Sequence, residues 1–215
     1  MLTLNAQSAK SADNQSTSIR TSGKYIGTIT RAEKLLSQNG TAGLGISFKS
    51  HDGQTADYLD LYTINGGGAE LPSSKIVHAI LAVLKMRTCK EGKINFEKWS
   101  ATEKKKINAQ ADGYPDLMDK KIGFLLQKEL YSDFKDGSDR DRMIVVGVFN
   151  ADNDLTASET LDGKTTPEKL PSMVNLLMDR PVRDSSKKGA SQAKPAQGYQ
   201  GGTGMPDDFG SDIPF

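Results

Sequence analysis

Apolar and polar residues alternate along the first third of the chain, with the period of half-buried β-strands. This pattern predicts strands over residues 23–33, 44–49 and 56–64. Between the first two strands, the segment SQNGTAG contains Asn39-Gly40, which is a strong signal for a hairpin turn. In the third strand, Leu59 and Leu61 share one face. We therefore expect three consecutive strands, joined by turns, with one apolar face.

The hydrophobic period then lengthens to that of a helix. Ile76, Ile80 and Leu84 form an apolar stripe at helical spacing, and Ser73 or Ser74 is placed to cap the helix. Further on, Ser100 followed by Glu103 matches a capping box, which predicts a second, polar helix that ends at the segment DGYP (112–115).

The second half of the chain begins with two more apolar segments. Residues 121–134 are rich in strand formers and residues 142–150 are almost continuously apolar, so both predict strands. A polar stretch follows, and then a short helix is expected in TPEKLPSMVNLLMD, with Thr166 as its cap. The predicted order is three strands, a helical connection and two strands.

That order is the element order of the OB-fold, a five-stranded, partly open barrel whose exposed face binds oligonucleotides. The expected fold class is therefore mostly β, with an OB-fold domain over 21–180 that carries a helical insertion at about 66–120. Residues 1–20 are polar and predict a flexible arm. Residues 181–206 are rich in Gly, Ser, Gln and Pro and predict a disordered linker before the last nine residues.

Composition excludes several classes of protein. The chain has one cysteine and two histidines, so neither a disulfide framework nor a Cys/His zinc site is expected, and no cofactor is predicted. It has no apolar segment suited to a signal peptide or a membrane span, which predicts a cytoplasmic protein without membrane contact. The net charge is +1, although a basic run over 85–106 precedes an acidic end.

The last nine residues, DDFGSDIPF, place Ile213 and Phe215 beside three aspartates at the chain terminus. This ending resembles the acidic tip of bacterial and phage single-stranded DNA-binding proteins, which follows a Gly-rich linker and typically ends Asp-Asp-Asp-Ile-Pro-Phe. The last four residues match position for position, whereas Gly210 and Ser211 replace acids of the pattern. The match covers nine residues, and the body looks more like a divergent phage version of the family.

The resemblance implies a function for both parts of the chain. The body would bind and protect single-stranded DNA without sequence specificity during replication, recombination and repair, in the host cytoplasm if the chain is phage-encoded. The tip would recruit replication and recombination proteins, with Phe215 in an apolar pocket of the partner. A homo-oligomer is compatible with this pattern. The implied partner-binding residues are Asp207, Asp208, Phe209, Asp212, Ile213, Pro214 and Phe215.

Binding of single strands needs rings that stack on bases and cations that contact phosphates. Strand parity and position at strand ends nominate Lys24, Arg31, Lys49, Tyr58, Tyr62, Lys121, Phe124, Lys128, Tyr131 and Arg142. Phe96 and Trp99 lie in the basic run. Either they clamp a base or they anchor the insertion to the body.

Two other functions compete with this interpretation. The segment PDLMDKK (115–121) resembles a metal-dependent nuclease pattern, but Asp116 and Asp119 are closer together than that pattern requires, so we do not expect an enzyme. Alternatively, an OB-like body binds RNA or protein as an adaptor. Comparing single-stranded DNA, duplex DNA and RNA across salt concentrations separates these classes.

Overall fold

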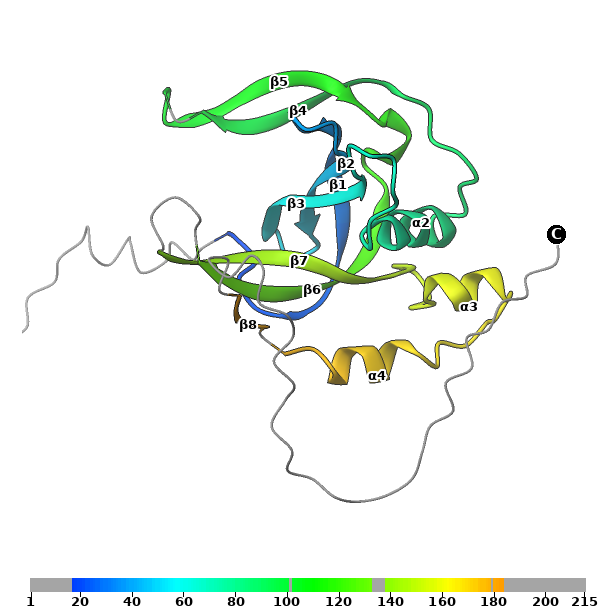
Figure 1. Ribbon diagram of the computed structural model, residues 1–215. Coiled ribbons are helices and arrows are strands. Elements are labelled where there is room, and N and C mark those ends of the chain that lie inside the picture. Colours follow the sequence, from blue (N-terminus) through cyan, green and yellow to red (C-terminus); the bar gives the residue numbers. More distant parts are fainter. Residues whose placement is uncertain (1–16, 101, 133–137, 179, 184–215) are drawn as a thin grey trace, which may run out of the picture. The chain divides into compact units, whose positions relative to one another are not determined.

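The computed structural model describes residues 17–100, 102–132, 138–178 and 180–183. The chain divides into two units, residues 1–185 and 186–215, of which the second lies outside the described residues. The first unit is mostly β, as predicted (Figure 1). Its strands are β1 (Gly23–Leu36), β2 (Ala42–Ser50), β3 (Thr55–Ile64), β4 (Gly92–Ser100), β5 (Lys105–Gly113), β6 (Lys121–Ser132), β7 (Asp139–Phe149) and β8 (Arg180–Arg183).

The strands form a largely antiparallel sheet around the long strand β1. One edge of β1 pairs with β2, which pairs with β3, and the other edge pairs with β6 and, at Glu33 alone, with β5. Strand β6 continues to β7, and β8 joins β6 in parallel. Strands β3 and β7 approach each other, but no register joins them among the described strands, so the sheet stays open.

The core lies on the face of the sheet that the alternation predicted. Leu44, Ile46 and Phe48 of β2 are buried, as are Leu59 and Leu61 of β3. Helix α2 (Ser74–Val83) covers part of this core with Ile80 and Val83, and it ends before Lys85, which adopts a left-handed conformation at φ 56°. All five predicted strands, which correspond to β1, β2, β3, β6 and β7, and the first predicted helix are present.

Two short helices follow β7. Helix α3 (Ala157–Leu161) was not predicted, although Thr156 and Glu159 form a capping box that opens it. Helix α4 (Leu170–Asn175) begins three residues later than expected and follows Lys169, so the predicted cap at Thr166 is wrong.

The carboxylate of Glu159 is fully buried and holds this region together. Burial raises the pKa of Glu159, but hydrogen bonds donated by the backbone N–H groups of Thr156, Glu168 and Lys169 and by the Thr156 hydroxyl outweigh burial and lower the pKa to about 2. The α3–α4 connection is thus fixed by a charge-assisted network.

The second predicted helix is wrong, because its segment forms strand β5, which pairs with β4 in a β-hairpin. Nine residue pairs are in register, from Gly92 opposite Gly113 to Ser100 opposite Lys105. The local contact expected at Ser100 is present, since the Glu103 backbone N–H donates to the Ser100 hydroxyl at 3.1 Å, but it stabilises the turn of the hairpin instead of a helix. In Figure 1 strands β1–β3 lie between this hairpin and strands β6 and β7.

The domain boundaries also differ from the prediction. Ile19, assigned to the flexible arm, is buried, and its backbone N–H donates to the carbonyl oxygen of Thr55 at 2.8 Å. At the other end, β8 includes residues 181–183 of the predicted linker. The sheet therefore takes in a few residues on each side of 21–180.

Candidate functional site

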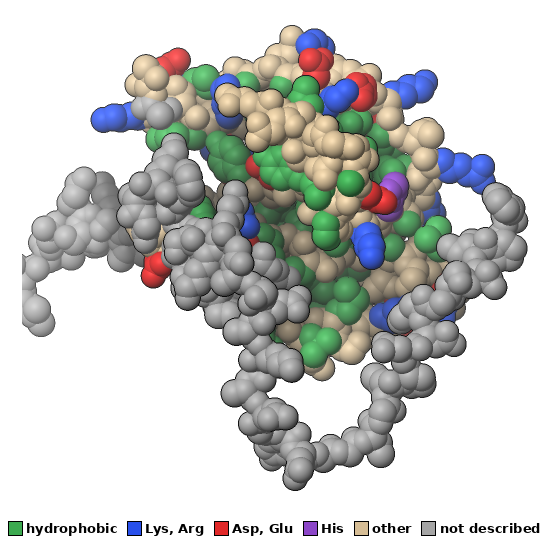
Figure 2. Space-filling model, in the orientation of Figure 1, with side chains coloured by type: hydrophobic (Ala, Val, Ile, Leu, Met, Phe, Trp, Pro, Cys, Tyr) green, Lys and Arg blue, Asp and Glu red, His purple; other side chains and the backbone are tan. Residues whose placement is uncertain are grey.

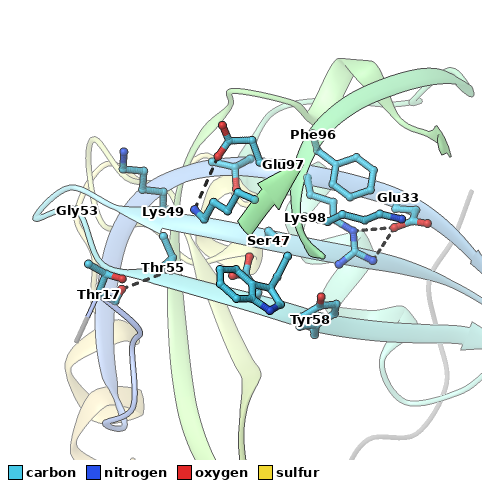
Figure 3. A pocket seen from close by; sticks show the side chains of 15 residues that line it. Thr17, Glu33, Ser47, Lys49, Gly53, Thr55, Tyr58, Phe96, Glu97 and Lys98 are labelled. Carbon is cyan, nitrogen blue, oxygen red and sulfur yellow. Dashed lines mark hydrogen bonds and ion pairs between the residues drawn. The ribbon is translucent and has the colours of Figure 1, made fainter. Parts of the chain in front are cut away.

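A groove of about 550 Å³ lies between the β4–β5 hairpin and the outer face of strands β1–β3 (Figure 3). We call it the hairpin groove. Figure 3 shows Phe96 and Glu97 on the hairpin and Ser47 and Tyr58 on the sheet, on opposite walls. The lining residues are Thr17, Thr30, Arg31, Glu33, Ser47, Lys49, Gly53, Thr55, Asp57, Tyr58, Phe96, Glu97, Lys98, Trp99 and Lys106.

Two register irregularities shape the floor of the groove. In β1, Ile29 and Arg31 pair with adjacent residues of β2, so that Thr30 is an extra residue. In β3, an irregularity between Ala56 and Leu59 turns both Asp57 and Tyr58 to the exposed face. Such β-bulges bend a strand and redirect its side chains, and they are enriched beside functional sites. Tyr58 has φ 58°, a strained conformation for a ring-bearing residue.

Arg31 connects the two walls. Its guanidinium lies 5.4 Å from the ring centre of Tyr58 on β3 and 5.4 Å from that of Phe96 on β4, within the range of cation–π contacts. It also forms an ion pair with Glu33 at 2.6 Å and is only 8% exposed. Because its charge is paired and covered, Arg31 acts as a bridge that positions Tyr58 and Phe96, and not as the predicted free phosphate contact.

The hairpin is attached to β1 by a close approach of backbones. A Cβ atom on Gly113 would lie 2.3 Å from the carbonyl oxygen of Ala32 and 2.8 Å from Cδ1 of Ile94, so only glycine fits at this crossing. Ile94 is buried there. The sequence left open whether Phe96 and Trp99 anchor the insertion or clamp a base. Ile94 is the main anchor, and Phe96 contributes through its contact with Arg31.

Trp99 is not an anchor, because 59% of it is exposed while it lines the groove. Tyr58, on β3, is 64% exposed. Large rings that remain exposed in a concave site are available to stack on a ligand. The groove therefore combines two accessible rings with the half-buried ring of Phe96.

The charges that line the groove are mixed. Lys49 and Lys98 form no ion pair with any described residue, whereas Lys106 pairs with Glu97 at 3.8 Å. Figure 2 shows basic side chains spread over the visible face with acidic ones between them. The cations of the groove are thus few, and two of them are available to contact phosphates.

Only three of the ten predicted DNA-binding residues, Arg31, Lys49 and Tyr58, meet in the groove. Phe124 is fully buried and packs edge-on against Phe48 with ring centres 5.1 Å apart, so its predicted stacking role is wrong. Tyr62 is 39% exposed on β3 but does not line the groove.

The other five predicted residues lie elsewhere and are paired. Lys24 and Lys121 form ion pairs with Asp154 at 2.6 Å and Asp152 at 2.7 Å, beyond the end of β7. On β6 and β7, Lys128 lies 3.8 Å from Asp141, and Arg142 pairs with Glu129 and lies over the ring of Tyr131 at 5.1 Å. These residues form two further clusters, separate from the groove.

The acidic residues of the nuclease-like segment have local structural roles. A carboxylate oxygen of Asp116 accepts a hydrogen bond from the Lys90 backbone N–H at 3.0 Å, and Asp119 occupies a left-handed turn position at φ 58°. Within the described part of the chain, no group of three or more His, Cys, Asp or Glu residues could hold a metal ion.

Sequence reasoning missed Asp57, Lys98 and Lys106 as groove residues. Counting back from Leu59 and Leu61 by twos places Asp57 on the core face, where an unpaired carboxylate is unfavourable. That conflict was the available signal for the bulge. Lys98 and Lys106 could be found only by recognising the hairpin.

Residues 207–215, the predicted partner-binding tip, lie outside the described residues. No family model matches the chain, and no curated protein matches it. Over the described ranges, no helix has both the length and the apolar character needed to cross a bilayer.

Proposed function

We propose that this chain binds single-stranded DNA in the hairpin groove, without catalysis and without strong sequence preference. The observation that carries the proposal is the joint presence of exposed Tyr58 and Trp99 with unpaired Lys49 and Lys98 in one concave site. Stacking of bases on rings tolerates any sequence, because every base has a π-face, and nearby lysines contact the backbone.

We further propose that the body is an OB-type barrel with the β4–β5 hairpin as an insertion. The connectivity supports this: β1–β3 form a meander, α2 follows, β6 returns beside β1, and β7 follows β6 and approaches β3. The outer face of β2 and β3, which forms much of the groove floor, corresponds to the face that OB-folds use for oligonucleotides.

The acidic tip completes the proposal. On the resemblance of its last nine residues to the single-stranded DNA-binding protein family, the tip recruits proteins of replication, recombination or repair, with the three aspartates steering it to a basic surface. This part of the proposal is supported by the sequence alone.

Fluorescence anisotropy with labelled dT12, the matched duplex and rU12 tests the DNA-binding function. We expect a clear preference for the single strand over the duplex. If Lys49 and Lys98 each contact a phosphate, the logarithm of the binding constant should fall with the logarithm of salt concentration with a slope of about −1.4. Equal binding to duplex contradicts the proposal, and selective binding of rU12 favours the RNA-binding adaptor.

A further inference from the structure

We propose that Asp57 contacts the Watson–Crick edge of a base stacked in the hairpin groove and gives the groove a preference for cytosine over uracil. This inference rests on the proposed function, because it assigns a base contact within the same groove.

The position of Asp57 follows from the irregularity in β3. Ala56 and Leu59 pair with Phe48 and Ile46, so β3 has one residue more than β2 between these pairs. Asp57 and Tyr58 are both exposed as a result, and both line the groove. The bulge thus places a carboxylate directly beside a ring that is free to stack.

Of the three carboxylates that line the groove, Asp57 differs from Glu33 and Glu97 because they form ion pairs with described residues and it does not. Glu33 is paired with Arg31 at 2.6 Å, and Glu97 lies 3.8 Å from Lys106. No ion pair or hydrogen bond joins the Asp57 carboxylate to any described residue. Asp57 is therefore the groove carboxylate whose acceptor capacity is free for a ligand.

The chemistry of a carboxylate decides which part of a nucleotide it contacts. An ionised carboxylate only accepts hydrogen bonds, so it repels phosphate oxygens and attracts N–H groups. The N4 amino group of cytosine donates to Asp or Glu, whereas uracil and thymine present the O4 carbonyl at the same position. On uracil the neighbouring N3–H could also donate to a carboxylate, so the preference arises when position 4 of the base faces Asp57. A pyrimidine stacked on Tyr58 in that orientation would be held more tightly as cytosine.

The test compares dC12 and dU12, which differ on the Watson–Crick edge, in binding to the full chain and to Asp57→Ala. Asp162→Ala serves as the control, because Asp162 is an exposed acid at the end of α3, outside the groove. Unequal stacking within the free oligonucleotides cancels when the dC12/dU12 affinity ratio of each variant is divided by that of the unmodified chain.

We expect Asp57→Ala to lower this ratio roughly three- to tenfold, the effect of one hydrogen bond, and Asp162→Ala to leave it unchanged. If Asp57→Ala raises both affinities equally, Asp57 acts only as a repulsive charge, and the inference is wrong while the proposed function stands. If the unmodified chain binds neither oligonucleotide, the proposed function itself is wrong.

Discussion

Replacing Trp99 with alanine should weaken binding of single strands while leaving the fold intact. Full burial of a large apolar side chain stabilises a fold by about 1.5–3 kcal/mol. Trp99 is 59% exposed, so the substitution removes less than half of that amount. The free energy of unfolding should therefore fall by about 1 kcal/mol. Loss of one stacked base costs about 1–3 kcal/mol of binding, which corresponds to roughly a 5- to 150-fold rise in Kd.

The assay is anisotropy of labelled dT12 at low salt, with thermal unfolding measured in parallel. Tyr62→Ala is the matched control, because Tyr62 is a partly exposed ring on β3 that lies outside the groove. A Kd for Trp99→Ala within twofold of the unmodified chain would refute the stacking role. A loss of affinity as large in Tyr62→Ala would instead show that the binding path extends beyond the groove.

Three further predictions concern the hairpin, the α3–α4 region and the tip. In Gly113→Ala the new methyl group should force the hairpin away from β1. Chemical denaturation should then show a free energy of unfolding lower by about 1–3 kcal/mol, and dT12 binding should weaken. Unchanged stability would contradict the close approach of the hairpin to β1. The pKa of Glu159 is lowered from 4.5 to about 2, so the stability its ionised carboxylate contributes is complete above about pH 4.5 and is lost as the pH falls toward 2. As the pH falls through that window, the free energy of unfolding of the unmodified chain should decrease by up to about 3 kcal/mol more than that of Glu159→Gln. If the two chains lose stability in parallel with pH, the Glu159 network is refuted. Removing residues 207–215 should leave or raise affinity for dT12, because it deletes three aspartates, which repel phosphates; sharply weaker binding would contradict the proposed separation of roles.

Alternation in the sequence was sufficient to locate β1, β2 and β3, and strand-forming composition located β6 and β7. Leu44, Ile46 and Phe48 are spaced by twos, and burial of one face follows directly from that period. The hairpin was missed because its strand β5, KKINAQADG, is rich in residues that disfavour strands. Pairing with β4 stabilises β5 as a strand despite its low strand propensity. The Ser100–Glu103 hydrogen bond occurs in tight turns as well as at the start of a helix, so it did not identify a helix here.

The groove was only partly predictable because it depends on contacts between segments distant in sequence. Tyr58 and Lys49 follow from strand parity, but Trp99 reaches the groove only through the hairpin. Arg31 has the expected charge, but its contact with the Phe96 ring depends on the hairpin. A bulge inserts a single residue and changes which side chains meet on a face, and of the two bulges only the one in β3 leaves a sign in the sequence, at Asp57.

The most direct test of the groove uses the intrinsic fluorescence of Trp99, which is the only tryptophan in the chain. Titration with dT12 should quench its emission to saturation, with a midpoint that moves to higher oligonucleotide concentration as salt is added. If anisotropy shows saturable binding of dT12 while the emission of Trp99 stays constant, the DNA does not occupy the hairpin groove and the central claim is contradicted.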